Sequence, residues 1–95
     1  MNYRIDYLLK YISNDTYRDI VNNKSLYILE DLEDNRVDVD LNIRYLIKCG
    51  IKHIDRVVYN RLDDLLLNHN DFIDKMDKYE QSLGKDGFID MLENV

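Results

Sequence analysis

A motif that recurs at a regular spacing is the strongest constraint on how this 95-residue chain can fold. The central copy lies at 43–60, a second copy follows 34 residues downstream, and a looser copy lies 38 residues upstream. The matching positions are Ile5, Tyr7, Leu8, Lys10, Arg18 and Asn22; Ile43, Tyr45, Leu46, Lys48, Gly50, Ile54, Arg56, Val57, Val58 and Asn60; and Tyr79, Gly84, Phe88, Met91, Leu92 and Asn94. Periods of this length are typical of stacked helical repeats, in which each copy holds a helix, a turn and a second helix. We therefore expect an all-α fold, a compact stack of about six to eight short helices built from three helix-turn-helix repeats.

Apolar residues spaced three and four positions apart set the expected helices. These cover 3–12, 15–23, 25–32, 41–49 and 54–62, a helical turn at 63–68, a long helix from Asn70 or Asp71 to Gly84, and a last helix from Asp86. Residues 36–40 alternate apolar and acidic side chains and are expected to connect two helices, with Asp38 or Asp40 capping the second. Helix should exceed about 60% of the chain, well above the usual third. The expected core is Ile5, Leu8, Leu46, Ile54, Val58, Leu66, Phe72, Met76, Leu83, Phe88 and Leu92.

Length and composition limit what the chain can be. Ninety-five residues suffice for one small domain, so 1–95 is expected to be a single helical domain. Its apolar runs are shorter than a membrane span of about 20 residues, and its first residues do not read as a signal peptide, so a cytoplasmic protein is expected. Cys49 is the only cysteine, so an intramolecular disulfide is impossible. The abundance of Asn, Asp, Ile, Tyr and Lys favours a low-GC bacterium or one of its phages as the source.

The sequence contains no recognisable catalytic or metal-binding motif. Cys49, His53 and His69 are the only thiol and imidazole groups, and Gly50 interrupts the helix that would align the first two as metal ligands. The only glycines are Gly50, Gly84 and Gly87, whose positions do not match a phosphate-binding loop, and no Ser-His-Asp arrangement can be assembled. We therefore expect a protein that is not an enzyme, with no catalytic residue, no metal and no cofactor.

The second half of the chain resembles a known helical repeat. The residues concerned are Gly50-Ile51, Ile54, Val57-Val58, Arg61, Leu65-Leu66, Leu83-Gly84, Phe88-Ile89 and Leu92. This order, over about 42–95, resembles the repeat of the mitochondrial transcription termination factors, in which a Leu-Gly step precedes two apolar pairs and another helix. The resemblance implies a curved stack of helices that binds nucleic acid. The chain departs from the family in two respects. It has Asp63 where proline is usual, and its net charge is −6, whereas the nucleic-acid-binding face of the family is basic.

Charge is distributed in blocks along the chain. Residues 25–41 hold six acidic residues and one basic residue, whereas residues 42–61 hold five basic residues and one acidic residue. The carboxylates of Glu30, Asp31, Glu33 and Asp34 can face a positively charged partner, or they can be a solvated helix end. The cations of Arg44, Lys48, Lys52 and Arg56 can grip phosphates, or they can balance their acidic neighbours.

Tyr3, Tyr7 and Tyr11 lie four residues apart on the first expected helix. They form either a widened core face or a partner surface, since tyrosine buries a ring and keeps a polar tip. The favoured interpretation is a non-enzymatic protein–protein interaction module, an acidic phage-type inhibitor of the anti-CRISPR kind that occupies a basic nucleic-acid-binding site on a host protein. The alternative is a nucleic-acid-binding regulator that uses residues 42–61. Partner binding is assigned to the carboxylates of the acidic run and the three tyrosines, and direct nucleic-acid binding is the less favoured case.

Overall fold

The computed structural model describes residues 3–94, and 79% of these residues are helical, with no strand among them. The expected all-α fold is therefore confirmed. The elements are a 3-10 helix η1 (Asp6–Lys10) and the α-helices α1 (Asn14–Asn23), α2 (Leu26–Asp34), α3 (Arg36–Lys48), α4 (Ile54–Asn60), α5 (Leu62–Leu65) and α6 (His69–Glu93).

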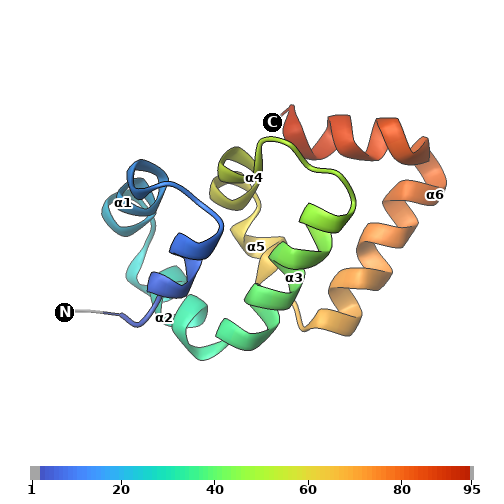
Figure 1. Ribbon diagram of the computed structural model, residues 1–95. Coiled ribbons are helices and arrows are strands. Elements are labelled where there is room, and N and C mark those ends of the chain that lie inside the picture. The colour runs from blue at the N-terminus through green and yellow to red at the C-terminus, as the bar shows by residue number, and fades with distance from the viewer. Residues whose placement is uncertain (1–2, 95) are drawn as a thin grey trace.

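The helices form a stack of three helix-turn-helix units that lie in a row (Figure 1). The first unit is η1 with α1, the second is α3 with α4, and the third is the two halves of α6. The three motif copies fall on these units, and the short helices α2 and α5 connect them. With principal extents of 42 × 25 × 20 Å, the molecule is about twice as long as it is thick.

Side-chain caps set where three of the helices begin. Ser13 and Ser25 accept hydrogen bonds from the backbone N–H groups of Thr16 and Ile28, and so cap α1 and α2. Asn68 accepts from Asp71 N–H and caps α6. The expected helix at 25–32 thus begins where the sequence placed it. Helices α1 and α6 begin slightly earlier than expected, because a polar residue just upstream is the cap.

The first expected helix, 3–12, is wrong in length and type. Only Asp6–Lys10 is helical, and it is a 3-10 helix. Tyr11 N–H closes a tight turn by donating to Leu8 C=O, and Ser13 already has the extended backbone of an N-cap. The chain must leave the first helix before Ser13 for α1 to begin there, which restricts η1 to little more than one turn.

The expected connection at 36–40 is also wrong, because α3 already begins at Arg36. Neither Asp38 nor Asp40 caps the helix, since Asn35 is the N-cap residue. The buried positions of α3 are Val39, Asn42, Ile43 and Leu46. Val39, Ile43 and Leu46 follow the i, i+4, i+7 spacing of a helix, and the alternation of apolar and acidic side chains over 36–40 obscured that spacing in the sequence.

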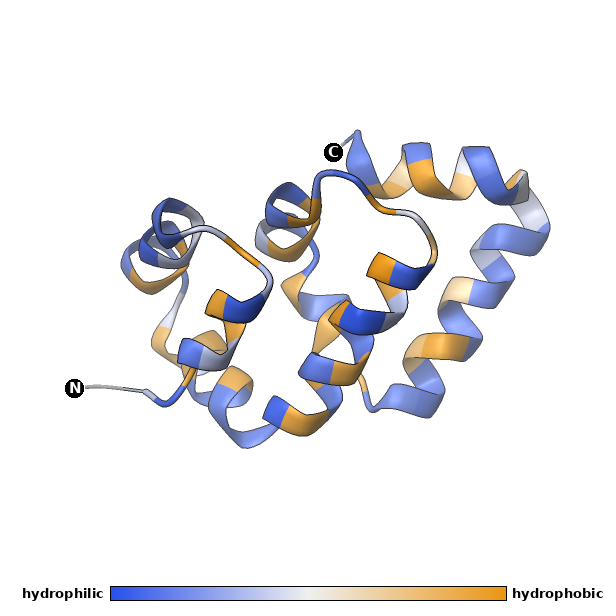
Figure 2. Ribbon diagram, in the orientation of Figure 1, coloured by the Kyte–Doolittle hydropathy of each residue, from blue (hydrophilic) through white to orange (hydrophobic). Residues whose placement is uncertain are grey.

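One core runs through the stack, and the apolar side of each helix faces it (Figure 2). Eight of the eleven expected core residues are buried, whereas Ile54 and Leu66 are half-buried. Leu83 is wrong, because 48% of it is exposed just before Gly84. Three apolar residues of the expected helices 15–23, 25–32 and 41–49 are exposed as well, namely Val21, Leu26 and Ile47. Each of these exposed residues lies at the margin of an otherwise correct apolar stripe.

A break at Gly84 divides α6 into two halves, as the sequence predicted. Gly84 has φ 76° and ψ 170°, and the second half turns back toward α4 (Figure 1). Lys75 follows Asp71 by four residues on α6, but the two side chains form no ion pair. Lys75 pairs with Asp64 of α5, so it joins the third unit to its connecting helix.

Candidate partner-binding surfaces

The acidic run lies on α2, and most of it faces outward. Tyr27, Glu30, Asp31 and Asp34 follow the i, i+3, i+4, i+7 spacing and are all exposed, so they share the face opposite the buried Leu29 and Leu32. Tyr27 is 81% exposed. We call these four residues the acidic strip. Within the described part of the chain, no cation forms an ion pair with its three carboxylates.

Glu33, the fourth expected carboxylate, has a different environment. It is half-buried beside the strip, and its Oε2 accepts a hydrogen bond of 2.8 Å from the backbone N–H of Arg4. Glu33 therefore holds the N-terminal segment against α2. Only three of the four carboxylates in the expected set are free of such contacts within the described residues.

Other carboxylates at the joints of the stack are engaged by the protein itself. Asp40 accepts from Tyr11, Asp55 accepts from Ser13 and Thr16, and Glu93 accepts from the N–H groups of Lys52 and His53. Asp64 pairs with Arg61 and Lys75. These carboxylates join units of the stack, in contrast to those of the acidic strip.

Hydrogen bonds perturb the pKa values of these engaged groups. Partial burial alone would raise the pKa of Asp40, but hydrogen bonds from Tyr11, Lys10 and Arg44 outweigh it and lower the pKa. Backbone hydrogen bonds from His53 and Lys52 lower the pKa of Glu93. Both carboxylates are therefore held in their ionised, hydrogen-bond-accepting form.

The three tyrosines of the N-terminal segment pack against the core. The Tyr7 hydroxyl donates to Leu32 C=O at 2.7 Å, and the Tyr11 hydroxyl donates to Asp40 Oδ1 at 2.7 Å. Burial and the bond to Asp40 raise the pKa of Tyr11 to about 12, and burial also raises the pKa of Tyr7. Tyr3 is half-buried. This arrangement favours the widened core face over the partner surface.

The expected basic set is exposed, but its members differ in their contacts. The guanidinium group of Arg44 lies 3.5 Å from the carboxylate of Asp40. Arg56 donates a hydrogen bond of 3.3 Å to the backbone C=O of Glu93, which is the last residue of α6. Lys52 lies in the turn before α4, where its backbone N–H, and not its ammonium group, contacts Glu93. Lys48 lies at the end of α3 and is exposed. Two of the four cations are thus partly occupied by acceptors of this chain.

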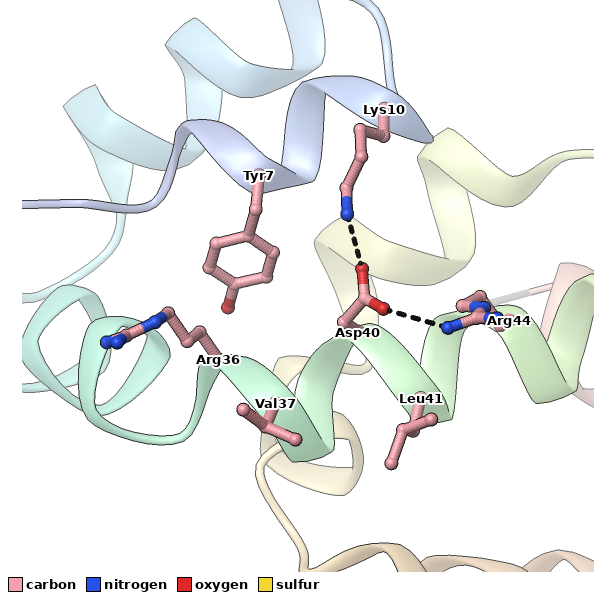
Figure 3. Close-up of a pocket in the computed structure, with 7 residues that line it drawn as sticks. All are labelled: Tyr7, Lys10, Arg36, Val37, Asp40, Leu41 and Arg44. Atoms are coloured by element: carbon pink, nitrogen blue, oxygen red, sulfur yellow. Dashed lines mark hydrogen bonds and ion pairs between the residues drawn. The ribbon is translucent and has the colours of Figure 1, made fainter.

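A pocket that the sequence did not indicate lies between η1 and α3 (Figure 3). It has a volume of about 290 Å³, and its charged lining residues are Lys10, Arg36, Asp40 and Arg44. Arg36, Asp40 and Arg44 lie four residues apart on one face of α3. The sequence did not indicate this face, because residues 36–40 were expected to be a connection. Lys10 comes from η1, and its place in the pocket depends on the fold.

The residues considered as metal ligands are separated in the structure. Cys49 is half-buried at the end of α3, His53 precedes α4, and His69 begins α6. Burial, followed by the charge of Glu80, raises the pKa of the Cys49 thiol. Across residues 3–94, no three side chains of His, Cys, Asp or Glu gather in a way that could hold a metal ion. Over the same residues, no helix combines the length and the apolar character that crossing a membrane requires.

The fold and these surfaces define a small all-α domain with an acidic strip on α2 and a cationic pocket between η1 and α3. A scan against protein-family models found no match, and searches of curated proteins and of solved structures found no similar protein.

Proposed function

We propose that this protein is a non-enzymatic interaction module that binds a basic surface of a partner protein through the acidic strip of α2. The observation that carries the proposal is the combination of three exposed carboxylates with Tyr27, which is 81% exposed at the start of the same helix face. The carboxylates at the joints of the stack are consumed by internal contacts, and those of the strip are not.

The chemistry of the strip suits a partner rich in arginine and lysine. Carboxylates accept charge-assisted hydrogen bonds from guanidinium groups, often in pairs. A tyrosine ring adds a large contact area and can lie against a guanidinium plane. The net charge of −6 would also speed the encounter with a basic surface.

A basic groove that otherwise holds a nucleic-acid backbone is the partner class that fits such a strip. Carboxylates placed on a helix face can substitute for phosphates in that groove, so the domain would act as a competitive inhibitor of a nucleic-acid-processing enzyme. A phage-encoded inhibitor, with anti-CRISPR proteins as one kind, is the biological form of this proposal.

The test compares variants in which carboxylates of α2 are neutralised with a control in which carboxylates of α6 are neutralised. The first variant carries Glu30→Gln, Asp31→Asn and Asp34→Asn, and the second adds Glu33→Gln to complete the run. The matched control carries Asp74→Asn, Asp86→Asn and Asp90→Asn, three exposed carboxylates of α6. Exposed charges contribute little to stability, so thermal midpoints should change little for the first variant.

The partner is first captured from a lysate of the native host, identified by mass spectrometry and purified. Its association rate with the first variant should then fall below the wild-type rate at low salt, and the difference should shrink at high salt. Tyr27→Ala should mainly increase the dissociation rate. Wild-type association by the first variant, or an equal loss in the α6 control, would refute the role of the acidic strip.

Nucleic-acid binding through residues 42–61 is the second candidate function, and the resemblance to the termination-factor repeat implies it. The exposure of Lys48 and Lys52 is the observation in its favour. The net charge opposes it, so we expect no retardation of DNA or RNA near physiological salt. Micromolar binding that is lost when Arg44, Lys48 and Arg56 are replaced together would establish this second function instead.

A further inference from the structure

The pocket between η1 and α3 holds more positive than negative charge. Lys10, Arg36 and Arg44 line it together with a single carboxylate, Asp40. This leaves an excess of two positive charges in a protein whose net charge is −6. The excess is not neutralised by another acidic side chain of the lining.

Asp40 organises two of these cations. Its Oδ1 accepts from Tyr11 at 2.7 Å and lies 3.0 Å from Lys10 Nζ, while its Oδ2 lies 3.5 Å from Arg44. Figure 3 shows Lys10 and Arg44 approaching Asp40 from different sides. Because one carboxylate is shared by two cations and a hydroxyl, it fixes their positions and leaves part of their hydrogen-bonding capacity unused.

Arg36 supplies a third cation that is free to reorient. Its Nη1 donates to the C=O of Glu33 at 3.4 Å, and it pairs with no carboxylate of the described residues. It is exposed at the rim of the pocket. A planar guanidinium at this place can turn toward a bound anion and donate two parallel hydrogen bonds.

An apolar wall lies beside the cations on the same helix. Val37 and Leu41 are one turn apart on α3 and line the pocket next to Arg36 and Asp40 (Figure 3). Val37 is 69% exposed although it is aliphatic. Cationic donors beside aliphatic side chains suit a ligand that has an anionic head and a small apolar body.

We propose that this pocket binds a small organic phosphomonoester, with its dianionic head between Lys10, Arg36 and Arg44 and its apolar body against Val37 and Leu41. A phosphomonoester carries a charge of about −1.5 to −2 at neutral pH, which matches the excess charge of the pocket. A phosphodiester carries only one charge, so a nucleic-acid backbone matches it less well. This inference does not depend on the acidic strip.

Phenyl phosphate is the probe, and amide chemical shifts of the isotope-labelled protein are the readout. Titration into the millimolar range should produce saturable shifts at residues 7–11 and 36–44. Inorganic phosphate should bind the same residues more weakly because it lacks the ring. Methyl phenyl phosphate, the diester, should bind about tenfold more weakly, as expected when one charge-assisted contact is lost.

Three variants test the assigned roles. Arg36→Gln removes a cation that makes no ion pair, and Val37→Asp places a negative charge at the exposed wall, so neither should disturb the fold. Arg36→Gln should weaken phenyl phosphate binding about tenfold, and Val37→Asp should abolish it. Arg44→Gln should also weaken binding, whereas Lys52→Gln, which lies outside the pocket, should leave it unchanged.

Several outcomes would overturn the proposal. These are the absence of saturable shifts in the two segments, equal binding of the monoester and the diester, and an equal loss in Lys52→Gln and Arg36→Gln. Tighter binding of an oligonucleotide at the same residues would assign the pocket to a nucleic-acid surface instead.

Discussion

The side-chain oxygen of Asn42 lies 2.8 Å from Nδ1 of His69, which joins α3 to the first residue of α6. The amide nitrogen of Asn42 donates to the carbonyl groups of Leu65 and Leu67 at 3.0 and 2.9 Å. Because both carbonyls require the amide nitrogen, the oxygen must face His69, and Nδ1 must carry the hydrogen. The one fully buried polar residue of the described core thus fastens the α5–α6 connection to α3.

Replacing Asn42 should therefore cost more than its size suggests. Asn42→Leu keeps the volume but removes the donors of two carbonyl groups, each worth about 1 to 3 kcal/mol when left unpaired. We expect the free energy of unfolding, measured by urea denaturation, to fall by roughly 2 to 4 kcal/mol. The exposed Asn22 provides the control, because Asn22→Leu should change it by less than about 0.5 kcal/mol. Equal effects at the two positions would mean that the Asn42 hydrogen bonds do not stabilise the fold.

The register of α3 can be tested with two adjacent residues. Leu46 is 1% exposed, whereas Ile47 is 42% exposed. Leu46→Ala should lower the free energy of unfolding by roughly 2 to 5 kcal/mol, since it creates a cavity in the core. Ile47→Ala should cost markedly less, because much of that side chain already contacts water. Thermal midpoints that drop equally in both variants would contradict this register.

The helical class and the three-unit organisation could be predicted because they depend on local signals. Apolar spacing marked the buried sides of most helices, Ser25 marked the start of α2, and Gly50 and Gly84 marked two turns with positive φ. The first turn of α3 was not predicted, because the alternation of apolar and acidic side chains over 36–40 obscured the helical spacing of Val39 and Ile43. The burial of Asn42 could not be predicted from apolar spacing either. A polar residue is buried there only because its partners, Leu65 and Leu67, come from a distant segment.

The candidate surfaces could be predicted only in part. The carboxylates of α2 were visible as a run of acidic residues, but Tyr27 was missed because it precedes that run. The pocket near Asp40 requires Lys10 to approach from η1, about 30 residues earlier in the chain, and no local pattern encodes such a contact. Glu33 differs from the other carboxylates of α2 because it accepts a hydrogen bond from the backbone N–H of Arg4, a contact that local sequence does not indicate either.

Acid should weaken the contact between the first and second units at Asp55. Burial alone would raise the pKa of this carboxyl, but hydrogen bonds from Ser13 and Thr16 outweigh it and lower the pKa below the ordinary 3.8. A lowered pKa means that the stabilisation is present above pH 3.8 and is lost as the pH falls through the folded-state pKa.

Asp55→Asn isolates this contribution. At neutral pH the variant should be less stable than the wild type by roughly 1 kcal/mol, because a charged acceptor is lost. The difference in denaturation midpoint should narrow as the pH falls below 3.8, where the wild-type carboxyl takes up its proton. Asp90→Asn, at an exposed site of α6, is the control and should follow the wild type at each pH. A difference in denaturation midpoint that widened as the pH fell would contradict a lowered pKa of Asp55 in the folded state.

The turn at Gly84 should depend on backbone conformation and not on space. A Cβ atom added at Gly84 would meet no atom within 4 Å, but φ 76° with ψ 170° is a conformation that glycine alone adopts readily. Gly84→Ala should therefore lower the free energy of unfolding by about 1 to 3 kcal/mol, or release the second half of α6 from α4. A D-alanine introduced at position 84 by chemical synthesis provides the matched comparison, because its mirror-image preference permits a positive φ while it adds the same methyl group. In urea denaturation, the free energy of unfolding of the D-alanine protein should be close to that of the wild type, and that of the L-alanine protein should be clearly lower. If both forms were destabilised equally, the cost would come from the methyl group itself, and the backbone argument would be wrong.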